Sequence, residues 1–193
     1  PAKEPIRIYA GLDSADSLEG RTAVLLSELQ RTRAYERKVM VIIPTTGTGW
    51  VDPVAARSIE SMYNGDTALV AMQYSFLPSW ISFLVDQQKS LQAGRAMIDA
   101  IHSRWLGWDP QRRPRLMLFG ESLGSQVSEE MFRGTGTSGP EGMGLDAAFW
   151  IGTPASTVFR QELWGKRTVT EAPEVGPDAF YLPRAIRDWD ALP

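Results

Sequence analysis

Five continuous apolar runs recur along the chain, and polar turn residues follow each of them. These runs predict strands at 6–11, 39–43, 67–74, 116–119 and 145–152. Apolar positions spaced three and four residues apart predict helices over about 17–30, 52–63, 81–105 and 125–132. Buried strands that alternate with helices indicate an α/β fold: a mostly parallel sheet covered by helices on both faces, in three layers.

Composition narrows the class of protein but does not name a function. The 193 residues are 43% apolar and 22% charged, which is typical of one globular domain over 1–193. A net charge of −3 without a basic patch does not suggest nucleic acid as a partner. The absence of cysteine excludes disulfides and thiolate metal sites, and no metal or other cofactor is expected. No signal peptide and no run of about 18 apolar residues is present, so the compartment stays open.

Two segments lack a clear periodic pattern. Residues 134–144 are rich in glycine and predict a flexible loop. Residues 153–193 predict an irregular or cap-like excursion, with a short helix near the end.

The sequence Gly120-Glu121-Ser122-Leu123-Gly124 stands where the fourth apolar run ends and a helical segment begins. A Gly-x-Ser-x-Gly pentapeptide between a strand and a helix predicts a nucleophile elbow, in which a sharp turn exposes the serine hydroxyl. The two glycines lack a Cβ atom, so the strand and the helix can approach closely. The alternative is a serine that only caps the helix.

Other polar and aromatic residues should share the edge of the sheet where the elbow lies, because ligands of parallel sheets bind at the carboxyl ends of strands. Asp13 and Ser14 line a pocket there or form a simple Asx turn. Trp50 and Phe76 shape an apolar pocket or serve in packing only. Glu121 is expected to lie beside the elbow with its side chain directed away from the hydroxyl.

Four stretches together resemble one bacterial family of α/β-hydrolase catalytic domains, whose catalytic domain usually follows several membrane-spanning helices. The stretches are Gly11–Ala15, Thr46–Pro53, Tyr74–Trp80 and Phe119–Gly124, and the resemblance covers roughly 6–190. It implies that Ser122 is the nucleophile, and that the backbone N–H of Leu123 and a donor near Thr46 or Gly47 form the oxyanion hole. It also implies a membrane-anchored parent protein, and a triad acid and histidine that follow the serine in the chain.

The histidine that the resemblance requires is missing after the serine. The single histidine, His102, precedes the serine within a helix, and we expect it to be structural. The candidate acids are expected to be helix caps or surface residues: Asp146, Asp178, Asp188 and Asp190. We therefore expect the last strands of the fold, the triad acid and the histidine to lie outside this chain.

Three hypotheses remain open. The first is a serine hydrolase or acyltransferase that acts on a small-molecule or lipid-like ester through an acyl-enzyme on Ser122. The second is a catalytically inactive binding or interaction module on a hydrolase fold. The third, compatible with the first, is that a partner segment or a neighbouring copy completes the sheet, because open strand edges invite pairing.

Overall fold

All five predicted strands are present and form one parallel sheet. The computed structural model describes residues 3–74, 87–135 and 138–164. The strands are β1 (Ile6–Ala10), β2 (Val39–Pro44), β3 (Thr67–Met72), β4 (Arg115–Glu121) and β5 (Ala147–Ile151). Their order in the sheet is β1-β3-β2-β4-β5, and every pairing is parallel. The α/β prediction is therefore confirmed.

Helices connect successive strands, and one more helix follows β5. They are α1 (Leu18–Arg31), α2 (Pro53–Met62), α4 (Gln87–Leu106), α5 (Leu123–Glu129), α6 (Ser138–Gly142) and α7 (Val158–Trp164). Short 3₁₀ turns are η1 (Leu12–Ser14), η2 (Ala34–Glu36) and η3 (Glu130–Phe132), of which η3 directly continues α5. Side-chain hydrogen bonds cap the N-termini of two of these helices. The Ser17 side chain accepts from Gly20 N at α1, and Asp52 accepts from Val54 N and Ala55 N at α2.

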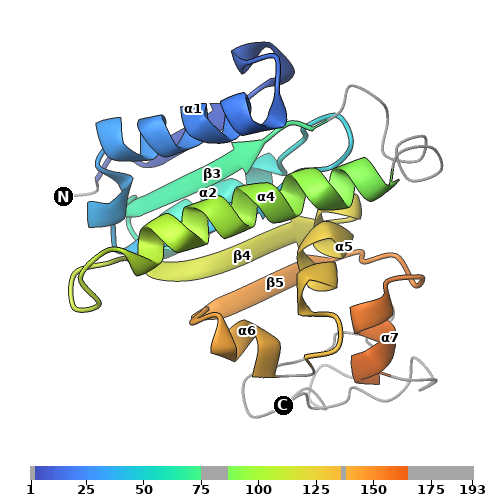
Figure 1. The fold of residues 1–193 in the computed structure, drawn as a ribbon. Helices are drawn as coiled ribbons and strands as arrows, with labels where there is room; N and C mark the ends of the chain where they lie inside the picture. Colours follow the sequence, from blue (N-terminus) through green and yellow to red (C-terminus); the bar gives the residue numbers. More distant parts are fainter. Residues whose placement is uncertain (1–2, 75–86, 136–137, 165–193) are drawn as a thin grey trace.

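Two apolar clusters, one on each face of the sheet, hold helices against it and so give the fold three layers. On one face, Leu25 and Leu29 of α1 and Ile98 and Ile101 of α4 pack against Ile42 and its neighbours in the sheet. Figure 1 shows α1 and α4 lying across this face, with α2 on the far side. On that far side, α2 packs against a second cluster, which contains Val41, Ile43 and Phe119. Helices on both faces confirm the three-layer prediction.

Coverage on both faces holds for the central strands but not for β5. Every residue of β2 and β3 is buried, whereas exposure alternates along β5. Phe149 is 55% exposed and Ile151 is 41% exposed, while Trp150 on the other face packs against the first cluster. Phe149 stacks on Phe119, with ring centroids 6.0 Å apart. Among the described residues, no helix lies over the outer side of this ring, so the helical cover of the sheet is less complete at β5 than at the central strands.

Several boundaries differ from those the pattern predicts. The strand predicted to reach residue 74 ends at Met72, and α4 is described only from Gln87, since 75–86 lie outside the described residues. The glycine-rich stretch 134–144 is not a loop throughout, because α6 forms within it. Its flexibility stays a prediction. The excursion predicted over 153–193 contains α7, and 165–193 lie outside the described residues. No helix within the described ranges is long and apolar enough to cross a bilayer.

Candidate active site

Ser122 has an unusual backbone between β4 and α5. Its φ is 52° and its ψ is −116°, a conformation that L residues rarely adopt and that costs about 1–3 kcal/mol. The residue occupies the N-cap of α5, but its side chain makes no capping hydrogen bond. The predicted sharp turn is therefore present. The serine hydroxyl does not cap the helix, whereas the alternative interpretation requires it to do so.

Close backbone packing holds this turn in place. A Cβ atom on Gly120 would lie 2.6 Å from Ser125 Cα, and one on Gly124 would lie 2.1 Å from the Pro44 carbonyl oxygen. Real Cβ contacts are not this short, so both positions require glycine in this arrangement. The glycines of the pentapeptide thus allow α5 to pack against the end of β4 and against the segment that follows β2.

Hydrogen bonds fix the backbone of the serine itself. Ser122 N donates to Ile151 O at 2.8 Å, which ties the elbow to the end of β5. Ser122 O accepts from Gln126 N at 3.2 Å and from Ser125 Oγ at 2.5 Å. A strained residue persists only where its surroundings hold it on several sides, and these three bonds do so.

The segment after β2 forms a closed turn beside the elbow. Gly49 N donates to Thr46 O at 2.9 Å, and Thr46 N donates to Trp50 O at 3.4 Å. Thr45 Oγ1, which is buried, donates to Met72 O at 2.9 Å and fixes the base of the turn to β3. Of the two predicted oxyanion donors, Thr46 already donates within the turn, and Gly47 is buried in the same turn. Contact between Gly124 and the Pro44–Thr45 backbone places this turn next to Leu123.

The other predicted pocket residues lie at varied distances from the elbow. Asp13 and Ser14 are exposed in η1 after β1, and three strand spacings, about 14 Å, separate β1 from β4. Trp50 is 55% exposed just before α2, on the edge that carries the elbow. Alternation along β4 places Glu121 on the α2 side of the sheet with Phe119, opposite to Gly120. Its Oε2 is buried without a hydrogen-bond partner among the described residues.

A buried carboxyl that sequence reasoning missed lies further along α5. Glu129 is 4% exposed and accepts from Thr153 Oγ1 at 2.5 Å, in the segment after β5. Burial raises the pKa of Glu129 to about 7, while the Thr153 hydroxyl and Arg160 oppose the shift. Arg160 Nη1 donates to Thr153 O at 2.6 Å, so α5, the segment after β5 and α7 meet at this point. The sequence signal that could have revealed this buried carboxyl is a glutamate within the apolar pattern of the elbow helix.

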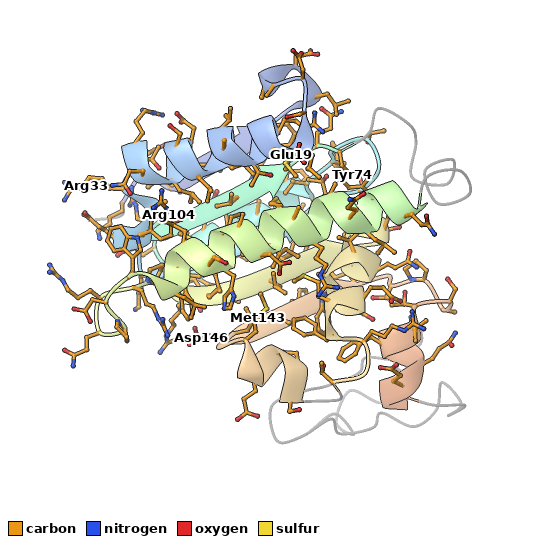
Figure 2. The ribbon with its side chains drawn as sticks, viewed as in Figure 1. Glu19, Arg33, Tyr74, Arg104, Met143 and Asp146 are labelled. Atoms are coloured by element: carbon orange, nitrogen blue, oxygen red, sulfur yellow. The ribbon has the colours of Figure 1, made fainter. Side chains whose placement is uncertain are left out.

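His102 and Asp146 lie at the opposite edge of the sheet. His102 Nε2 is 2.8 Å from Met143 O, and its ring stacks on Trp105. Asp146 precedes β5 and accepts from Leu116 N at 2.9 Å, at the start of β4. Figure 2 labels Met143 and Asp146 at this amino end of the strands and Tyr74 at the other end. Since β4 has seven residues, about 20 Å separates its two ends.

Four further candidates cannot be placed. Phe76, Asp178, Asp188 and Asp190 lie outside the described residues. Within the described ranges, no group of three or more histidine, cysteine, aspartate or glutamate side chains is arranged to hold a metal ion.

Comparisons with known proteins give one family and one structural likeness. A family model described as "Alpha/beta-hydrolase family" matches residues 6–182. No curated protein matches the chain. Among solved structures, an iodinated complex of acetyl xylan esterase is similar at 16% identity with a TM-score of 0.42. The match covers 61% of this chain and spans 64% of the length of that esterase.

Proposed function

This chain belongs to the alpha/beta-hydrolase family, and on that premise we propose that it is the nucleophile-bearing part of a serine hydrolase or acyltransferase that acts on an ester. One observation carries the proposal. Ser122 is held in a strained strand-to-helix turn while its hydroxyl makes no capping bond. In this family such a turn exposes the serine that attacks the substrate.

The chemistry follows from the two turns at this edge. The Ser122 oxygen attacks the ester carbonyl carbon, and the carbonyl oxygen becomes a tetrahedral oxyanion. The N–H group of Leu123 and a donor near Thr46 or Gly47 bind that oxyanion, and removal of one such donor costs about 3 kcal/mol in barrier. The general base takes the Ser122 proton during the attack and gives it to the leaving alcohol when the intermediate collapses to an acyl-enzyme, which water or an acceptor alcohol then resolves.

The general base of this mechanism is not His102. Its ring is bonded to Met143 O at the amino edge, about one strand length from Ser122. We therefore propose that the histidine and its acid are supplied by polypeptide outside this chain, which completes the site at the carboxyl edge. Membrane anchoring of the parent protein stays a prediction of the resemblance.

An apolar, lipid-like acyl group fits the surroundings best. Trp50 and Val54 are 55% and 71% exposed at the start of α2, on the edge that carries the turns. Exposed apolar side chains at the end of the sheet that carries Ser122 favour an acyl chain over a charged substrate.

A fluorophosphonate probe tests the nucleophile. In the natural polypeptide that contains this sequence, the probe should label Ser122, and Ser122→Ala should abolish labelling without loss of the folded state. Ser103→Ala is a matched control, because Ser103 is an exposed serine of α4 and its loss leaves the bonds of the elbow intact. Absence of labelling in the folded natural polypeptide would overturn the proposal.

The second candidate function is a binding or interaction module without catalysis. The observation that favours it is the position of His102 at the edge opposite to Ser122. Under this hypothesis, the natural polypeptide binds an ester or lipid but neither hydrolyses it nor reacts with the probe. Labelling of Ser122 at a measurable rate excludes it.

We also propose that further polypeptide, a partner segment or a second copy, covers the open side of β5. The exposed Phe149 and Ile151 support this, because an apolar edge strand invites pairing. Sedimentation velocity of the chain should show concentration-dependent association. A monomer at all concentrations would count against it.

A further inference from the structure

Two side chains from neighbouring strands hold the tip of the turn after β2. Gln73, the residue after β3, donates from Nε2 to Thr48 O at 3.1 Å and accepts from Leu12 N through Oε1 at 3.3 Å. Tyr9 of β1 donates from its hydroxyl to Gly49 O at 3.1 Å. Partial burial raises the pKa of Tyr9, so its hydroxyl stays protonated and able to donate.

The turn is shaped to lie against these two side chains. Gly49 has a φ of +87°, and a Cβ atom at this position would lie 2.1 Å from the Tyr9 hydroxyl and 2.8 Å from Gln73 Cγ. Only glycine combines this backbone conformation with this contact. The backbone of Gln73 is itself fixed, because its N–H donates to Ala10 O at 2.9 Å.

The turn is therefore fastened at both ends. At its base, Thr45 Oγ1 bonds to Met72 O, and the Pro44–Thr45 backbone packs against Gly124 of the elbow. At its tip, Gln73 and Tyr9 fix two successive carbonyl groups. Because a peptide unit is planar, the fixed Thr48 carbonyl also sets the direction of the Gly49 N–H, and the bond from that N–H to Thr46 O fixes the Thr46–Gly47 peptide unit in turn. The orientation of the whole turn relative to the elbow thus depends on bonds made from β1 and β3.

We propose that Gln73 and Tyr9 are positioning residues that keep the turn Thr46–Trp50 aligned with the elbow for oxyanion binding. This inference rests on the proposed function, since it assigns these side chains a part in the reaction of Ser122. Neither side chain touches the ester. They act through the turn, with Gln73 as the larger contributor because it joins three segments: β3, η1 and the turn.

Three substitutions separate the contributions of these bonds. Gln73→Ala removes the side-chain bonds to Thr48 O and Leu12 N. Gln73→Glu keeps an acceptor for Leu12 N but cannot donate to Thr48 O once it is ionised. Tyr9→Phe removes only the bond to Gly49 O. Gln111→Ala, at an exposed position of the loop before β4, is the matched control for loss of a surface glutamine.

The readouts are kcat and KM for ester hydrolysis and the rate of fluorophosphonate labelling, in the natural polypeptide that contains this sequence. Gln73→Ala and Gln73→Glu should lower kcat by about ten- to hundredfold with KM nearly unchanged, since a displaced donor stabilises the transition state less. Tyr9→Phe should lower kcat by less, and Gln111→Ala should match the wild type. Thermal unfolding shows whether each variant remains folded.

The outcomes distinguish this inference from the proposal on which it rests. An active wild type whose folded Gln73 variants keep the same kcat overturns the inference and leaves the proposed function standing. A wild type that neither labels nor hydrolyses esters overturns both. If Gln73→Ala does not fold, Gln73→Glu and Tyr9→Phe decide, because they change one polar group each and keep the side-chain volume. A lower kcat with a nearly unchanged KM in these two variants supports the inference.

Discussion

The carboxyl ends and the amino ends of the parallel strands, called here the carboxyl edge and the amino edge of the sheet, are built from different kinds of contact. The carboxyl edge carries tight backbone turns, with Ser122 strained between two glycines and the turn Thr46–Trp50 beside it. The amino edge carries ordinary side-chain contacts, such as His102 with Met143 O and Asp146 with Leu116 N. A strained backbone turn therefore holds Ser122 at the carboxyl ends of the strands, while the single histidine helps to hold helix and loop together at the amino ends.

A methyl group at the elbow should have the broadest effect, because it changes both stability and probe labelling. Gly124→Ala places a Cβ atom 2.1 Å from Pro44 O, so the helix or the turn must move. We expect a loss of about 2–3 kcal/mol in the free energy of unfolding and little or no probe labelling. Gly142→Ala, at the end of α6 with no atom within 4 Å of the added Cβ, is the matched control. Urea unfolding of both variants measures the difference, and equal stabilities would contradict the packing described for the elbow.

The next test concerns the buried carboxyl of α5. The pKa of Glu129 is raised from 4.5 to about 7 by burial, so the folded state binds its proton more tightly than the unfolded state. The stability due to this proton is fully present below pH 4.5 and is lost as pH rises towards 7, by about 3 kcal/mol in total.

Glu129→Gln isolates that contribution. The variant keeps an acceptor for Thr153 Oγ1 but carries no titrating proton. It should match the wild type near pH 4.5 and exceed it in stability above pH 7, when both are unfolded by urea across this range. Glu141→Gln, an exposed position on α6, controls for removal of a surface charge. Parallel stability curves for wild type and Glu129→Gln would show that the carboxyl is not buried as described.

A smaller effect is expected at Ser122, the proposed nucleophile. Ser122→Gly relieves a strain of about 1–3 kcal/mol, and the greater freedom of glycine in the unfolded chain offsets about 0.5–1 kcal/mol of that gain. The glycine variant should therefore be about 1 kcal/mol more stable than Ser122→Ala, which keeps the strained φ. Neither variant can be labelled. Thermal melts of the two decide, and a less stable glycine variant would argue against strain at this residue.

The smallest effect is expected at the amino edge. His102→Leu removes the bond to Met143 O and should cost about 1 kcal/mol of stability. The rate of probe labelling at Ser122 should not change, because the two residues lie at opposite edges. A folded His102 variant that loses labelling would show that the histidine takes part in the site after all.

Sequence reasoning located the strands well because their patterns are strong. Val39–Pro44 and Thr67–Met72 are buried along their whole length, as their continuous apolar runs predict. The elbow was equally visible, since glycine, serine and glycine at fixed spacing have few other uses between a strand and a helix. Strand and helix ends were less certain, and α6 within the glycine-rich stretch was missed because five residues give no periodicity.

The candidate site was predicted less completely than the fold. Gln73, Tyr9 and Glu129 carry no motif, and each becomes important only through a residue far along the chain: Thr48, Gly49 and Thr153. The open face of β5 was also hidden, because exposure of Phe149 depends on which helix covers the strand and not on its own apolar pattern.

What the amino-acid sequence determined by itself was local: which segments are strands or helices, and that Ser122 stands at a turn between two of them. Periodicity and glycine spacing encode these features within a few residues. The tertiary structure alone decided which segments meet. The order β1-β3-β2-β4-β5 places β2 beside β4, and so the turn Thr46–Trp50 lies beside the elbow. The parallel direction of the strands places His102 and Ser122 at opposite ends of them, because α4 returns to the amino end of β4 and His102 lies near the end of α4.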